Sequence, residues 1–123
     1  MFANTQAYSG IAVNDIQKAR EFYGKTLGLQ TSEEHGLLWL HLAGGRETLV
    51  YEQASVTPAS YTILNFQVDD IDTAVDQLTA RGVRFERYDG VNQDSKGVFR
   101  DEGPYIAWFK DPAGNVLSVL QEK

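Results

Sequence analysis

The sequence predicts an α+β fold of two βαβββ modules in tandem, because two stretches of the chain recur in matched order. The first is Tyr8–Ile16, where a run of small or apolar residues leads to an aspartate and then to a helical pattern. It returns 55 positions later as Ile63–Ile71. The second is Leu49–Gln53, which matches Leu117–Gln121 at an offset of 68. Paired matches at this spacing indicate a duplicated supersecondary unit.

The first module, residues 1–57, has the signals of one helix among four strands. Asp15 is placed to cap the helix, and Gly28 stands where a left-handed C-cap would end it. The apolar face of this helix consists of Ile16, Ala19, Phe22, Tyr23 and Leu27. The strands are expected at Tyr8–Val13, Gln30–Glu34, Leu37–Leu42 and Thr48–Gln53.

The second module, residues 58–123, follows a linker at Ala54–Ser60 and repeats this order. Asp70 caps its helix and Gly82 ends it. Its strands are expected at Thr62–Val68, Val83–Tyr88, Tyr105–Lys110 and Val116–Gln121. The segment Asp89–Gly103 carries three glycines and little periodicity, and a loop of this length is usually functional or mobile.

Composition narrows the classes of function. The net charge is −6 and neither module has a Lys/Arg cluster, so we expect no nucleic-acid partner. No apolar run approaches the roughly 20 residues that span a bilayer, and the N-terminus lacks the pattern of a secretion signal. The chain has no cysteine, which excludes disulfides and thiolate chemistry. A cytoplasmic protein without membrane contact is therefore expected.

The sequence resembles the vicinal oxygen chelate superfamily, which contains glyoxalases, bleomycin resistance proteins and extradiol dioxygenases. Three pieces carry the resemblance and together cover nearly the whole chain. They are Val13–Ile16 running into Phe22-Tyr23 and Leu27–Leu29, then Val68–Ile71 continuing to Gly82-Val83, and finally Phe109–Asn115. The resemblance implies that each module forms a half-curled sheet, that the two sheets enclose a ligand cup, and that the chain is a homodimer.

The resemblance also implies where metal ligands would stand. Metal-dependent members place His, Glu or Gln near the start of the first strand and in the last strand of each module. Those positions here are Tyr8, Val50, Ile63 and Ser118. Two apolar side chains and two neutral hydroxyls are poor ligands beside imidazole and carboxylate. We therefore expect no metal and no other cofactor.

Candidate ligand contacts follow from strand alternation. Trp39 and His41 alternate with Leu38, Leu40 and Leu42, so they are expected on the face that looks into the cup. Glu52 is expected to share the inward face of Val50. The full set of expected ligand contacts is Tyr8, Trp39, His41, Val50, Glu52, Ile63, Asn65, Phe99, Arg100 and Ser118. Arg100 is a candidate clamp for an acidic ligand, and Asp89–Gly103 a candidate lid.

Other expectations leave alternatives open. His41 and Glu52 are the best candidate acid–base pair, and Tyr8 is a further candidate. One or both of the pair could instead face outward, or His41 could only hydrogen-bond a ligand. Trp108 is expected in the core, because the repeat pairs it with Leu40.

These features favour a metal-independent small-molecule binding protein of the glyoxalase and bleomycin resistance type. One alternative is a lyase or isomerase acting on a small oxygenated metabolite. A second alternative is an accessory or regulatory binding module. The sequence leaves open whether the protein is an enzyme, because one scaffold supports many functions.

Overall fold

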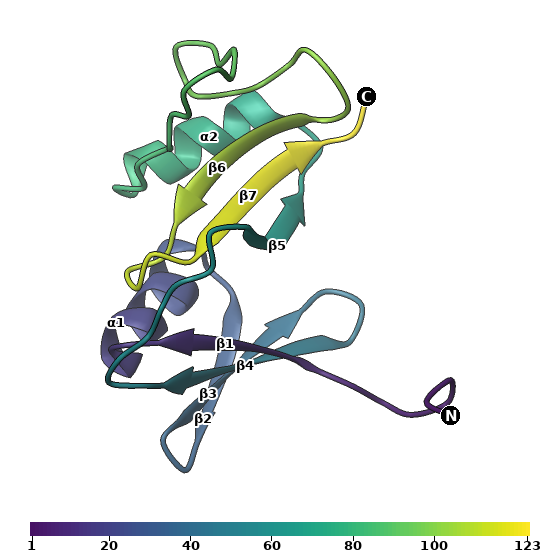
Figure 1. Ribbon diagram of the computed structural model, residues 1–123, viewed down its shortest axis with the longest axis vertical. Helices are drawn as coiled ribbons and strands as arrows, with labels where there is room; N and C mark the ends of the chain where they lie inside the picture. The colour runs from purple at the N-terminus through teal and green to yellow at the C-terminus, as the bar shows by residue number, and fades with distance from the viewer. The chain divides into compact units, whose positions relative to one another are not determined.

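The chain folds into two compact units, which the computed structural model describes over all residues from 1 to 123 (Figure 1). The first unit is Met1–Val56 and the second is Thr57–Lys123. Each unit combines one mixed sheet with helical turns on one face, which confirms the predicted α+β class. No helix is long and apolar enough to cross a membrane.

The first unit contains a four-stranded sheet in the order β1-β4-β3-β2. β1 runs parallel to β4, whereas the other neighbours are antiparallel. Its elements are β1 (Ser9–Val13), α1 (Ile16–Arg20), η1 (Glu21–Thr26), β2 (Gln30–Glu34), β3 (Leu37–Leu42) and β4 (Arg46–Glu52). The predicted strands are all present, within a few residues at their ends.

The predicted first helix is divided into an α-helical turn, α1, and a π-helical turn, η1. The wider turn is visible in the hydrogen bond from the Leu27 N–H to the Phe22 carbonyl, at 2.9 Å. Asp15 caps α1 by accepting from the backbone of Gln17 and Lys18, as predicted. Gly28 has a φ of 74°, which agrees with the expected left-handed C-cap.

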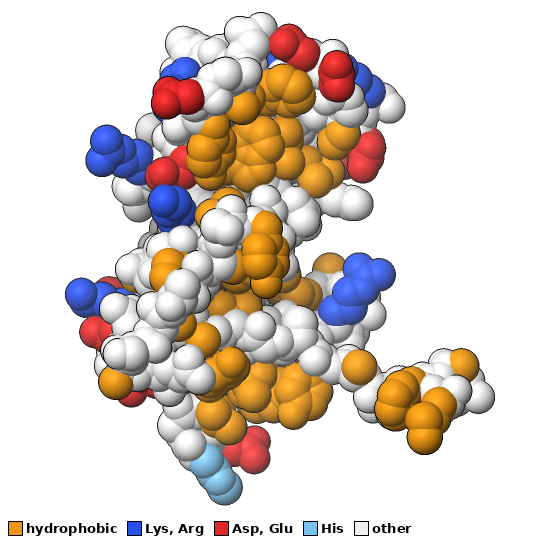
Figure 2. All heavy atoms as spheres, in the orientation of Figure 1, with side chains coloured by type: hydrophobic (Ala, Val, Ile, Leu, Met, Phe, Trp, Pro, Cys, Tyr) orange, Lys and Arg blue, Asp and Glu red, His pale blue; other side chains and the backbone are white.

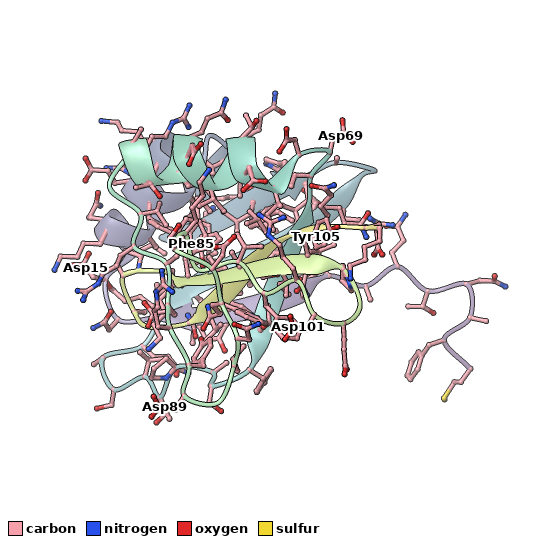
Figure 3. All side chains as sticks on the ribbon, turned by 90° about the horizontal axis from the view of Figure 1, so that it is seen from above. Asp15, Asp69, Phe85, Asp89, Asp101 and Tyr105 are labelled. Carbon is pink, nitrogen blue, oxygen red and sulfur yellow. The ribbon has the colours of Figure 1, made fainter.

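The second unit contains a three-stranded sheet in the order β5-β7-β6, covered on one face by α2 (Figures 1 and 3). Its elements are β5 (Thr62–Gln67), α2 (Ile71–Ala80), β6 (Tyr105–Lys110) and β7 (Val116–Gln121). β5 is parallel to β7, which repeats the pairing of β1 with β4. The strand expected at Val83–Tyr88 is reduced to an isolated bridge between Phe85 and Phe109.

Each unit contains an equivalent hydrogen bond between its last strand and the start of its helix. The two bonds show which residues of the last strands correspond. Glu52 Oε1 accepts a hydrogen bond from the Ile16 N–H at 3.0 Å, at the start of α1. Gln121 Oε1 accepts from the Ile71 N–H at 2.8 Å, at the start of α2. Glu52 is therefore equivalent to Gln121, and the repeat in the last strands spans 69 positions instead of the expected 68. A slip of one residue moves every side chain to the other face of a sheet.

The core of each unit lies between its sheet and its helix. In the first unit Val50 pairs with Ile11 and Leu38, and these three side chains are at most 5% exposed. In the second unit the equivalent row centres on Val119 and Ala107, beneath Ile71 and Val75 of α2. One face of each sheet is thus committed to packing against a helix, and the opposite face is left for other contacts.

The stabilising effect of the Glu52 contact can be measured by replacing Glu52 with alanine and, as a control, with glutamine. Glu52→Ala removes the acceptor at the start of α1 and should lower the free energy of unfolding by about 1 kcal/mol. Glu52→Gln should cost far less, because Gln121 makes the same contact in the second unit with a neutral amide. Urea unfolding of both variants measures the difference. Equal losses in the two variants would show that the charge matters and not the acceptor.

Candidate functional site

The face of the first sheet opposite α1 carries Trp39 and His41 on β3. Their cross-strand partners on β4 are Leu49 and Glu47. Tyr8, just before β1, meets Trp39 edge to face with ring centroids 4.8 Å apart and an interplanar angle of 74°. Tyr8 is 62% exposed, so this aromatic pair is open to a ligand. Tyr8, Trp39 and His41 thus lie together, on the face that strand alternation indicated.

His41 is held between two polar side chains on the neighbouring strands. Its Nε2 lies 2.8 Å from Ser32 Oγ on β2, and its Nδ1 lies 2.8 Å from Glu47 Oε2 on β4. The sequence paired His41 with Glu52, and that pairing is wrong. The hairpin register offered the better signal, since His41 and Glu47 flank the turn at 43–45 symmetrically.

Val50 and Glu52 lie on the opposite face, and their assignment to the ligand face was wrong. Val50 is fully buried against the helix, where a side chain of its size contributes ~1.5–3 kcal/mol to stability. Glu52 uses its carboxylate to cap α1. Leu49 takes the place on the ligand face that the sequence assigned to Val50, because it pairs directly with Trp39.

The second sheet has an equivalent face opposite α2. Ser118 Oγ donates to Asn65 Oδ1 at 2.6 Å, and the two residues are cross-strand partners. Trp108 pairs with Ser118 on its other side. With the repeat set at 69 positions, Trp108 corresponds to Trp39 and not to Leu40, so its placement in the core was wrong.

Aromatic rings gather around Trp108 on β6. Figure 2 shows apolar side chains in the part of the second unit where Figure 1 draws β6 and β7. The ring centroids of Tyr88 and Phe99 lie 5.6 Å and 6.5 Å from that of Trp108. Burial raises the pKa of Tyr88, and the negative charge of Glu86 acts in the same direction. Phe99 therefore belongs to an aromatic group, in which no sequence pattern placed Tyr88 or Trp108.

Ile63 occupies an irregular position on β5. Thr62 pairs with Val116 and Leu64 with Leu117, so Ile63 is the extra residue of a β-bulge. It is partly buried and has no cross-strand partner. Its equivalence to Tyr8 through the 55-residue repeat is retained, but the bulge alters the local direction of the strand.

Arg100 is committed to the protein's own carboxylates, contrary to its expected role as a clamp for an acidic ligand. Its Nη2 lies 2.8 Å from Asp72 Oδ1 on α2, and its Nε lies 3.2 Å from Asp94 Oδ2. The guanidinium also stands 5.0 Å from the ring centroid of Tyr105, which Figure 3 labels at the start of β6. Burial alone would lower the pKa of Arg100, but Asp94 and Asp72 outweigh it and raise that pKa.

The loop 89–103 is anchored through Asp94. Burial opposes the charge of this carboxylate, but the backbone N–H groups of Val98 and Lys96 and the Arg100 guanidinium outweigh it and lower the pKa of Asp94. Lys96 adds a 3.0 Å ion pair with Asp76 of α2. This part of the loop is pinned to α2, which does not support its expected role as a lid.

The residues at the four positions where the resemblance implies metal ligands do not fit a metal site. The corrected register replaces Val50 by Leu49, so the four positions hold Tyr8, Leu49, Ile63 and Ser118. Ser118 is also engaged with Asn65. Nowhere in the chain do three or more His, Cys, Asp or Glu side chains come together as a metal-binding group.

Two units of this kind, each pairing its first and last strands in parallel beneath a single helix, define a duplicated α+β protein. The chain belongs to the glyoxalase/bleomycin resistance protein/dioxygenase superfamily, whose family model matches residues 5–119. Members of this superfamily bind small molecules.

Individual proteins are also similar to this chain, each at less than 30% sequence identity. YraH of Bacillus subtilis (strain 168) is 28% identical over 127 residues, which cover 90% of this chain and 93% of that protein. The crystal structure of a glyoxalase family protein from Enterococcus faecalis matches with a TM-score of 0.70 and 22% identity, covering 98% of this chain and 99% of that one. TnmS3, an antibiotic binding protein from Streptomyces sp. CB03234, matches with a TM-score of 0.69 and 23% identity over 98% of both chains.

Proposed function

We propose that this protein is a metal-independent binding protein for a small molecule that carries a planar ring. The observation that carries the proposal is the equivalence of Trp39 and Trp108. Each lies on the face of its sheet that no helix of its own unit covers, and each contacts another aromatic ring. Flat aromatic surfaces beside a few polar groups are typical of small-molecule sites.

The polar groups on these faces favour a neutral or cationic ligand. Arg100, the expected partner of an acidic ligand, is already paired with Asp72 and Asp94. The net charge of −6 also disfavours an anion. Asn65 on the second face and Glu47 on the first offer acceptors, and the partly buried indole rings can attract cations through their π faces.

A sequestering role agrees with the similarity to TnmS3, which binds an antibiotic. We extend to this chain only the class of activity, which is the binding of a small molecule, and we propose that this chain holds its ligand without chemical change. The homodimer and the cytoplasmic location expected from the sequence remain predictions. So does the alternative of a lyase or isomerase, for which Glu52 is no longer a candidate acid–base group, because it caps α1.

Metal independence can be measured directly. Protein purified without an affinity tag and dialysed should hold no stoichiometric transition metal, because Tyr8, Leu49, Ile63 and Ser118 lack imidazole and carboxylate groups. Elemental analysis is the measurement, and titration calorimetry with Zn²⁺, Ni²⁺ and Mn²⁺ is its complement. One tightly bound ion per chain would contradict the proposal.

Ligand binding can be tested by removing one indole. A thermal-shift screen of ring-containing metabolites and antibiotics should first identify a stabilising compound. Trp39→Ala should then weaken its binding by about tenfold or more, equivalent to ~1.4 kcal/mol. Phe2→Ala is the matched control, because it removes an aromatic ring that is 74% exposed in the N-terminal segment. Unchanged affinity in a folded Trp39→Ala variant would exclude this face as the site.

A further inference from the structure

We propose that Ser32, His41 and Glu47 form a nucleophilic relay on the Trp39 face, able to take the acyl group from a small aryl ester. This activity goes beyond ligand binding and does not require the natural ligand to be an ester. The proposal is carried by one juxtaposition: a histidine ring bridges a serine hydroxyl and a carboxylate, with 2.8 Å on either side.

The roles of the two ring nitrogens follow from their partners. An ionised Glu47 can only accept, so the Nδ1 of a neutral His41 carries the proton and donates it to Oε2. Nε2 is then the acceptor for the Ser32 hydroxyl. This is the arrangement by which a carboxylate orients a histidine and the histidine serves as general base for a serine.

The sheet positions the three side chains. Ser32, His41 and Glu47 come from the neighbouring strands β2, β3 and β4, so no loop has to move to bring them together. Groups mounted on strands are held more precisely than groups on loops. His41 and Glu47 keep 37% and 49% of their side-chain surface exposed, and Ser32 is also exposed, so a substrate can reach the relay.

The surroundings of Ser32 indicate the class of substrate. Its cross-strand partner is Trp39, so an aromatic ring stacked on that indole lies next to the hydroxyl. β2 is the edge strand of its sheet, so no further strand lies beyond Ser32 to block the approach of a substrate. An ester of a phenol has a ring that can stack on Trp39, is small enough to reach Ser32 from the edge of the sheet, and carries a good leaving group.

The reaction balances without any further reagent except water. Ser32 Oγ attacks the ester carbonyl carbon while its proton passes to His41 Nε2, and the bond from that carbon to the phenol oxygen breaks. The phenol oxygen takes the proton from Nε2. Water then attacks the acyl-serine with His41 again as base, which releases the carboxylic acid and restores the hydroxyl. Because the relay is partly exposed, it does not enclose and orient the attacking water, so we expect slow deacylation and an acyl-serine that can be trapped.

The same hydrogen bonds could serve only to hold three strands together. The test therefore measures a covalent reaction at Ser32 and not stability alone. The full-length protein is treated with p-nitrophenyl acetate, the release of nitrophenolate is followed, and the acetylated residue is mapped by mass spectrometry. One acetyl group should appear on Ser32. Ser32→Ala should abolish that label, and His41→Gln should slow acetylation about 100-fold. Glu47→Gln should slow it about tenfold or more, because the histidine loses its orienting carboxylate.

Two control variants separate the relay from background reactivity. His35→Asn removes the other histidine at a turn position with a φ of 56°, which asparagine tolerates. Ser60→Ala removes an exposed serine of the second unit. Neither should change the labelling of Ser32. The proposal is overturned if Ser32 is not acetylated, or if His41→Gln and Glu47→Gln lower the melting temperature while the labelling rate stays the same. Ring-ligand binding that persists in Ser32→Ala would leave the proposed binding function intact in either case.

Discussion

The tie between the last strand and the helix start governs each unit of this protein. Glu52 in the first unit and Gln121 in the second accept from the first N–H of their helices, at the end of a strand paired in parallel with the first strand. This contact stands at the same place in β4 and β7, and the burial of Val50 and Val119 under the helices holds the register that it marks. Once the register is set, strand alternation decides which side chains pack under the helix and which remain for a ligand.

Much of the fold could be predicted from the sequence because its signals are local. The aspartate caps, the glycine C-caps and the 55-residue repeat of strand and helix each depend on a few adjacent residues. The face of the last strands could not be predicted in the same way. Leu49–Gln53 matches the second module almost equally well at 68 and at 69 positions, and the choice depends on the distant contact of Glu52 with Ile16.

The choice of an offset of 68 positions instead of 69 accounts for most of the errors at the candidate site. It placed Val50 and Glu52 on the ligand face, and it placed Trp108 in the core. The remaining differences come from tertiary contacts that no local pattern encodes. Arg100 is bound by Asp72 from α2, and the segment that was expected to form a strand at Val83–Tyr88 makes only one bridge before the anchored loop. Trp39 and His41 were located correctly relative to the leucines because they depend only on alternation within β3.

The central claim is that ligands bind the helix-free face of the sheets, where Trp39 and Trp108 occupy equivalent places. The most direct measurement is a ¹H–¹⁵N NMR titration that follows the two indole N–H signals, assigned with Trp39→Phe and Trp108→Phe. With a compound that stabilises the protein, an indole signal should shift in a saturable way while the amide signals of α1 and α2 stay in place. Saturable shifts confined to the two helices, with both indole signals unchanged, would contradict the account.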